Sequence, residues 1–197
     1  PDIAGYCRIA LGEQLGRQTT VLMLEGACGD VGWIDPGSRP QGGVEHAERI
    51  GRALADSVAA AVRTAKPVAV HEMVYRSSTL TIPDRTPDES EYCEDACRGS
   101  SPGEIEAQRK RYHPERVAVG KRGSTSAEVE IAALILGGTA LITNPAELFC
   151  SLGKEIRRHS RFPVTLLAEL SNGYAGYVPR EEDFDSGGYE THRTVYS

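Results

Sequence analysis

The chain has 197 residues, of which 40% are hydrophobic and 25% charged, a composition that predicts one globular domain, or two small ones, with a sizeable aliphatic core. A formal net charge of −6, with no run of like charges longer than Arg109-Lys110-Arg111, argues against nucleic acid as a partner. No apolar run approaches the roughly 18 residues that span a bilayer, so no transmembrane segment is expected.

The first third of the chain predicts two helices separated by a strand. Apolar residues recur at helical spacing over residues 2–15 and again over residues 43–63. Between them, residues 19–24 are rich in β-formers and end in Gly26-Ala27-Cys28-Gly29-Asp30. A strand that runs into a glycine-rich loop is a common entrance to an active site.

The remainder predicts a mixed sheet. Residues 68–82 resemble one long strand or a bent pair, followed by a polar stretch over 83–101 and a short charged helix over 104–112. Residues 128–136 and 139–143 form a predicted hairpin around Gly137-Gly138. A helix is expected to open at Asn144, and a last strand covers 164–170. We therefore expect an α/β fold, with one mixed sheet or a pair of sheets and helices on the outside.

Glu147 has two interpretations. Asn144 suits the N-cap of a helix and Pro145 its first position, which would place Glu147 third, where it closes a capping box. Capping alone would explain the segment. A metal-binding carboxylate at the same position is the alternative.

Two tyrosines, Tyr174 and Tyr177, follow the last predicted strand in a loop with Asn172, Gly173 and Gly176. They could simply pack over a tight turn, or one phenol could serve as a ligand or proton donor. Because a free phenol has a pKa of about 10, the second role needs a neighbouring cation or metal.

The loop residues Gly26, Ala27, Cys28 and Gly29 are small enough for their backbone N–H groups to approach a substrate oxyanion, with Asp30 beside them. A nucleophilic Cys28 would need a nearby base and a lowered pKa. Cys93 and Cys97 have a helical i,i+4 spacing that would suit half a metal site, a local disulfide or two free thiols. The five histidines follow no zinc-binding pattern, so the residues alone predict no complete metal site.

Four motifs together resemble the neutral/alkaline, non-lysosomal ceramidase superfamily, and most of all its bacterial ceramidase-like branch. They are residues 24–31 (LEGACGDV), the helix over 43–55, residues 144–149 (NPAELF), and residues 172–182 (NGYAGYVPREE) with Gly187-Gly188-Tyr189-Glu190. They occur in order across nearly the whole chain. The resemblance implies a C-terminal-half fragment of a ceramidase-like catalytic domain, with residues 1–197 as one partial domain.

The resemblance also implies a zinc site made by two histidines, a glutamate and a tyrosine. The glutamate falls on Glu147 and the tyrosine on Tyr177, and both histidines are expected upstream of residue 1. Asp30 and Arg180 would help position the substrate, with Tyr174 beside the oxyanion pocket. Ceramidases carry a serine at the position of Gly32, and its loss here puts ceramide itself in question as a substrate.

The expected function is zinc-dependent hydrolysis of an amide (N-acyl) bond by metal-activated water, on a small-molecule or lipid amide. Activity is expected of the full-length protein rather than of this fragment without its N-terminal half. The alternatives are an inactive ceramidase-like domain that serves in binding or structure, and a thiol hydrolase built on Cys28. The sequence assigns no cellular compartment.

Overall fold

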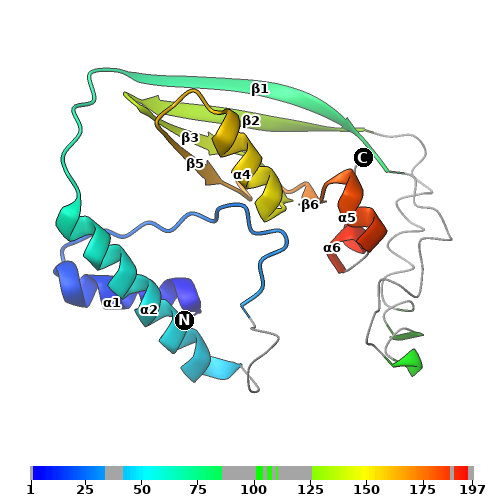
Figure 1. Ribbon diagram of the computed structural model, residues 1–197, viewed down its shortest axis with the longest axis horizontal. Helices are drawn as coiled ribbons and strands as arrows, with labels where there is room; N and C mark the ends of the chain where they lie inside the picture. Colours follow the sequence, from blue (N-terminus) through cyan, green and yellow to red (C-terminus); the bar gives the residue numbers. More distant parts are fainter. Residues whose placement is uncertain are drawn as a thin grey trace. The chain divides into compact units, whose positions relative to one another are not determined.

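The computed structural model describes residues 2–33, 42–85, 126–186 and 189–194, together with residues 101–103, 106, 107 and 110. The chain divides into two compact units, one of residues 1–24 and 32–70 and one of residues 25–31 and 71–197 (Figure 1). The single-domain assignment stays a prediction.

The first unit is a pair of packed helices, α1 (Ile3–Leu15) and α2 (Gly43–Thr64). Both confirm the predicted helices. The Asp2 carboxylate caps α1 by accepting a hydrogen bond from the Ile3 N–H at 2.7 Å. Small side chains let the helices approach closely, and the buried core consists of Cys7, Ala10, Leu11, Ala55 and Ala59.

The prediction of a strand over residues 19–24 is wrong, because the structure has no strand there. No backbone hydrogen bond joins residues 20–24 to another residue that the structure describes, and Leu22 is 85% exposed. A β-type sequence forms a strand only where a partner strand accepts and donates its backbone hydrogen bonds, because the strand has none within itself.

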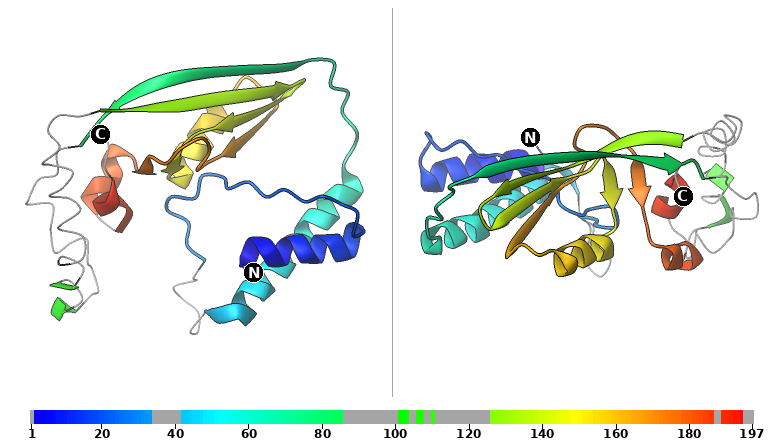
Figure 2. Two further views of the ribbon diagram at one scale, coloured as in Figure 1. Left: turned by 180° about the vertical axis from the view of Figure 1, so that it is seen from behind. Right: turned by 90° about the horizontal axis from the view of Figure 1, so that it is seen from above.

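The second unit contains a four-stranded mixed sheet in the order β1-β2-β3-β5. Its strands are β1 (Met73–Pro83), β2 (Ser126–Leu136), β3 (Thr139–Thr143) and β5 (Val164–Ala168). The first three run antiparallel and β3 pairs with β5 in parallel, with helix α4 (Cys150–His159) beside β5 (Figure 2). The α/β fold class is confirmed, as is the Gly137-Gly138 hairpin, where Gly137 has a φ of +58°.

A second, two-stranded parallel sheet pairs β4 (Ala146–Leu148) with β6 (Gly176–Val178), and α5 (Glu181–Ser186) and α6 (Tyr189–Arg193) follow it. The prediction of a helix opening at Asn144 is wrong, because residues 146–148 are a strand and α4 starts at Cys150. The Asn144 side-chain oxygen accepts from the Ala146 N–H at 2.9 Å and so forms a turn into β4 rather than a helix cap.

The other sequence predictions change in detail or go untested. β1 begins at Met73, five residues later than expected. The polar stretch, the short charged helix and Cys93 and Cys97 lie wholly or largely outside the described residues. Of the helices that the structure describes, none is long and apolar enough to cross a membrane.

Candidate active site

The pairing of β4 with β6 places Glu147 directly opposite Tyr177. Neighbouring strands lie about 4.8 Å apart, so in-register partners present their side chains side by side. The Tyr174 hydroxyl donates to Glu147 Oε1 at 3.2 Å, and Tyr189 meets the Tyr177 ring edge-on with 5.9 Å between centroids. One carboxylate and three phenol rings therefore gather where two strands and α6 meet.

The electrostatics of this cluster keep the Tyr174 and Tyr177 phenols protonated. Burial raises the pKa of Tyr177, and the negative charge of Glu147 raises it further. The pKa of Tyr174 is raised for the same two reasons, with Arg193 acting in the opposite direction. A cation among these oxygens would reverse the effect of Glu147 by favouring the phenolate form.

The glycine-rich loop, residues 25–30, lies against β4 and is tied to it through the backbone. The Gly29 N–H donates to the Leu148 carbonyl at 2.9 Å, and the Glu169 N–H donates to the Glu25 carbonyl at 3.0 Å. Gly29 packs so tightly that an added Cβ would lie 3.0 Å from the Leu148 carbonyl carbon and closer still to the Glu147 carbonyl oxygen. The loop is thus seated against the backbone of Glu147 and Leu148.

Glu169 is the one element of this arrangement that sequence reasoning missed. It is only 4% exposed, and its carboxylate accepts from the Leu148 N–H at 3.0 Å and from the Cys28 N–H at 3.3 Å. Burial raises its pKa, while the hydrogen bonds act to lower it. The only signal in the sequence is a glutamate that ends a hydrophobic strand just before Ser171-Asn172-Gly173. In the structure the next residue, Leu170, has an unusual φ of +53°.

Of the four loop N–H groups predicted to face an oxyanion, two have acceptors inside the protein. The Cys28 N–H binds Glu169 and the Gly29 N–H binds Leu148. Within the described residues, Gly26 and Ala27 have no acceptor for their N–H groups. Binding of an oxyanion by this loop therefore stays a prediction. Of its four N–H groups, those of Gly26 and Ala27 are the two that remain available for it.

Cys28 has the environment of an inert thiol. Its Sγ lies 3.6 Å from Glu169 Oε2, and burial, followed by the charges of Glu169 and Glu25, raises its pKa to about 12. Because the thiolate is the reactive form, this environment argues against a thiol hydrolase.

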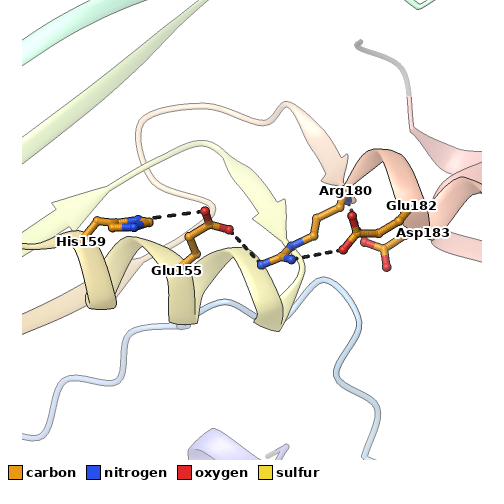
Figure 3. Close-up of polar contacts among 5 residues, drawn as sticks. All are labelled: Glu155, His159, Arg180, Glu182 and Asp183. Carbon is orange, nitrogen blue, oxygen red and sulfur yellow. Dashed lines mark hydrogen bonds and ion pairs between the residues drawn. The ribbon is translucent and has the colours of Figure 1, made fainter.

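Asp30 and Arg180 both have protein partners. Asp30 Oδ1 accepts from the Cys150 N–H at 2.6 Å and so caps the start of α4. Arg180, after β6, contacts Glu155 of α4 through Nη2 at 2.9 Å and Glu182 through Nη1 at 3.2 Å (Figure 3). Its backbone N–H also donates to Asp183 Oδ2 at 2.7 Å, so this residue fastens α5 to α4.

The donors of the cluster fit part of a metal site. No group of three or more His, Cys, Asp or Glu side chains in the described part of the chain could hold a metal ion. Glu147 and Tyr177 offer two adjacent oxygen donors, and the phenol is one whose pKa a cation would lower. Carboxylate oxygen is an established zinc ligand, but a zinc site needs nitrogen or sulfur donors as well to reach its usual four ligands.

Comparison with known proteins gives structural matches alone. No protein-family profile matches the chain, and no curated protein sequence matches it. The structure is similar to neutral ceramidase from Pseudomonas aeruginosa, with a TM-score of 0.61 and 18% identity over the whole of this chain. It is also similar to a ceramidase complexed with C2, with a TM-score of 0.59 and 18% identity. The fold is ceramidase-like. The chain spans 38% and 39% of the lengths of those two proteins.

Proposed function

We propose that the full-length protein is a zinc-dependent hydrolase that cleaves an amide (N-acyl) bond. The observation that carries the proposal is the pairing of Glu147 with Tyr177 across β4 and β6, with a third oxygen, the Tyr174 hydroxyl, 3.2 Å from the carboxylate. The ceramidase-like fold supports it. In this proposal Glu147 and Tyr177 hold zinc together with two histidines from the protein upstream of residue 1.

The chain's own residues orient the reacting groups. Zinc, when bound, would polarise a carbonyl and lower the pKa of a water to about 7. Tyr174 stays protonated, and its hydroxyl donates a hydrogen bond to Glu147, which fixes the direction of that carboxylate. The free N–H groups of Gly26 and Ala27 would bind the oxygen of the scissile carbonyl.

Asp30 and Arg180 would act more indirectly. Asp30 holds the start of α4 against the loop, and with it the loop backbone. Arg180 would orient an anionic group of the substrate only by releasing Glu155 or Glu182. Because Gly32 has no hydroxyl, the proposed reaction uses water and needs no serine at that position, and the substrate class is N-acyl amides rather than ceramide specifically.

The proposal is tested by hydrolysis of a panel of N-acyl amides with the full-length protein, with and without a chelator. Glu147→Gln and Tyr177→Phe should each reduce kcat/KM at least a hundredfold. The protein offers control positions outside the cluster: the Tyr75 hydroxyl donates to an exposed carboxylate of β2 at 3.1 Å, and Glu13 is an exposed glutamate of α1. Tyr75→Phe and Glu13→Gln should leave the activity unchanged.

Hydrolysis that resists both the chelator and the Glu147→Gln change would contradict the proposal. A folded protein that cleaves none of the amides would favour the alternative, an inactive domain in which the Tyr174–Glu147 hydrogen bond merely fastens a turn.

A further inference from the structure

The two edges of β4 are bound in different ways. On one edge the residues next to Leu148 face β6, since Glu147 pairs with Tyr177 and the Phe149 N–H donates to the Val178 carbonyl at 3.1 Å. Successive residues of a strand point their backbone groups to opposite edges, so both the N–H and the carbonyl of Leu148 face the other edge. A third strand would usually bind there.

Here a side chain takes the place of that strand. The Leu148 carbonyl accepts from Gly29, and the Leu148 N–H donates to both Glu169 oxygens, at 3.0 and 3.1 Å. The same carboxylate accepts from Cys28, and the Glu169 N–H reaches Glu25 at the start of the loop. One residue therefore connects β4 to the glycine-rich loop at two points.

The Glu169 carboxylate is buried, and its hydrogen bonds must offset the free-energy cost of removing it from water. Glu169 is 4% exposed, and no basic side chain that the structure describes forms an ion pair with it. A buried carboxylate without a counter-ion is costly unless hydrogen bonds satisfy it. Backbone N–H donors from two separate segments supply them, so the carboxylate is held only where β4 and the loop are both in place.

We infer that Glu169 is a positioning residue for the site: it fixes the backbone at Leu148 and Cys28 and thereby directs the adjacent Glu147 carboxylate towards Tyr174 and Tyr177. This inference rests on the proposed function, because Glu147 is the residue that the proposal gives to zinc. Residues that orient a metal ligand change metal affinity by about 10–100-fold when altered.

The test measures zinc affinity of the full-length protein by competition with a chelator, and the visible absorption spectrum after Co²⁺ replaces zinc. Glu169→Gln removes the acceptor from one side of the carboxyl group, and Glu169→Asp keeps the charge on a side chain one methylene shorter. Both should bind zinc at least tenfold more weakly than the parent and show an altered Co²⁺ spectrum, while circular dichroism shows them folded. If Glu169→Gln fails to fold, Glu169→Asp serves alone.

The matched control is Glu25→Gln, which removes an exposed carboxylate of the same loop and leaves the Glu169 contacts intact. It should retain the parent affinity and spectrum. Folded Glu169 variants that equal the parent in both readouts would overturn the inference, since a purely structural role changes stability alone. An equal loss in Glu25→Gln would overturn it as well, because charge rather than position would then be responsible. A parent that takes up no zinc would instead overturn the proposed function, and this inference with it.

Discussion

Replacing Gly153 with alanine tests how α4 is packed against the glycine-rich loop. Alanine in place of glycine inside a helix normally stabilises by up to about 1 kcal/mol. At Gly153, however, a Cβ would collide with the Cβ of Ala27 and lie 3.2 Å from Leu167 Cδ1. The Ala27 side chain has no rotatable bond that could move its Cβ aside, so the loop backbone itself must shift.

Gly12 is the matched control, since it lies inside α1 and a Cβ there meets nothing within 4 Å. The propensity gain is common to both substitutions and cancels in their difference, which leaves the cost of overpacking, about 1–3 kcal/mol. We expect Gly12→Ala to raise the free energy of unfolding or leave it unchanged, and Gly153→Ala to lower it.

A double-mutant cycle identifies the contact responsible. Adding Ala27→Gly to Gly153→Ala removes the colliding Cβ, so the double variant should regain most of the lost stability, with a coupling energy of about 1–3 kcal/mol. Urea denaturation with peptide-resolved hydrogen exchange reports on α1 and α4 separately. If Gly153→Ala stabilises α4 as Gly12→Ala stabilises α1, the described packing of the loop on this helix is refuted.

Three further predictions concern Cys28, Glu169 and Gly51. Cys28, whose pKa is raised to about 12, should resist iodoacetamide at pH 8 in the folded protein and react once urea unfolds the chain, as peptide mass spectrometry can show. Alkylation of the folded protein at the rate of a free thiol would contradict the raised pKa. Because burial raises the pKa of Glu169, the stability that this group contributes is fully present below the ordinary value of 4.5 and is lost as the pH rises through the folded-state pKa. The unfolding free energy of the parent should therefore fall relative to that of Glu169→Gln between pH 4 and 7. A constant difference between the two proteins would contradict this burial. Gly51→Ala should destabilise the α1–α2 pair by about 1–3 kcal/mol, because its Cβ would lie 2.6 Å from Tyr6 Cβ, and an unchanged urea midpoint would argue against this close approach.

Elements with a local signal were predictable from the sequence. The helical periodicity of α1 and α2 and the Gly137-Gly138 turn of the hairpin depend on residues near one another in the chain. β4 was not predictable in this way, because Asn144-Pro145 followed by Glu147 satisfies every rule for a helix start. Pairing with β6, 30 positions further along at Tyr177, decides the outcome in favour of a strand.

The same distinction applies to the candidate site. Glu147 and Tyr177 were singled out through a resemblance between motifs, and only the structure shows that they are partners in one register. Asp30 and Arg180 were expected to serve a substrate, and the structure gives each of them a partner on or beside α4. Glu169 had only a weak local signal, since its role depends on backbone donors at Cys28 and Leu148, which lie 141 and 21 positions away.

The most direct test of the central claim is the zinc content of the full-length protein by elemental analysis. It should be measured beside a Glu147→Gln, Tyr177→Phe double variant and a Glu13→Gln, Tyr75→Phe control. The proposal predicts about one zinc per chain in the parent and the control, and none in the first double variant. A folded parent without zinc, or a double variant that keeps the metal, would contradict it.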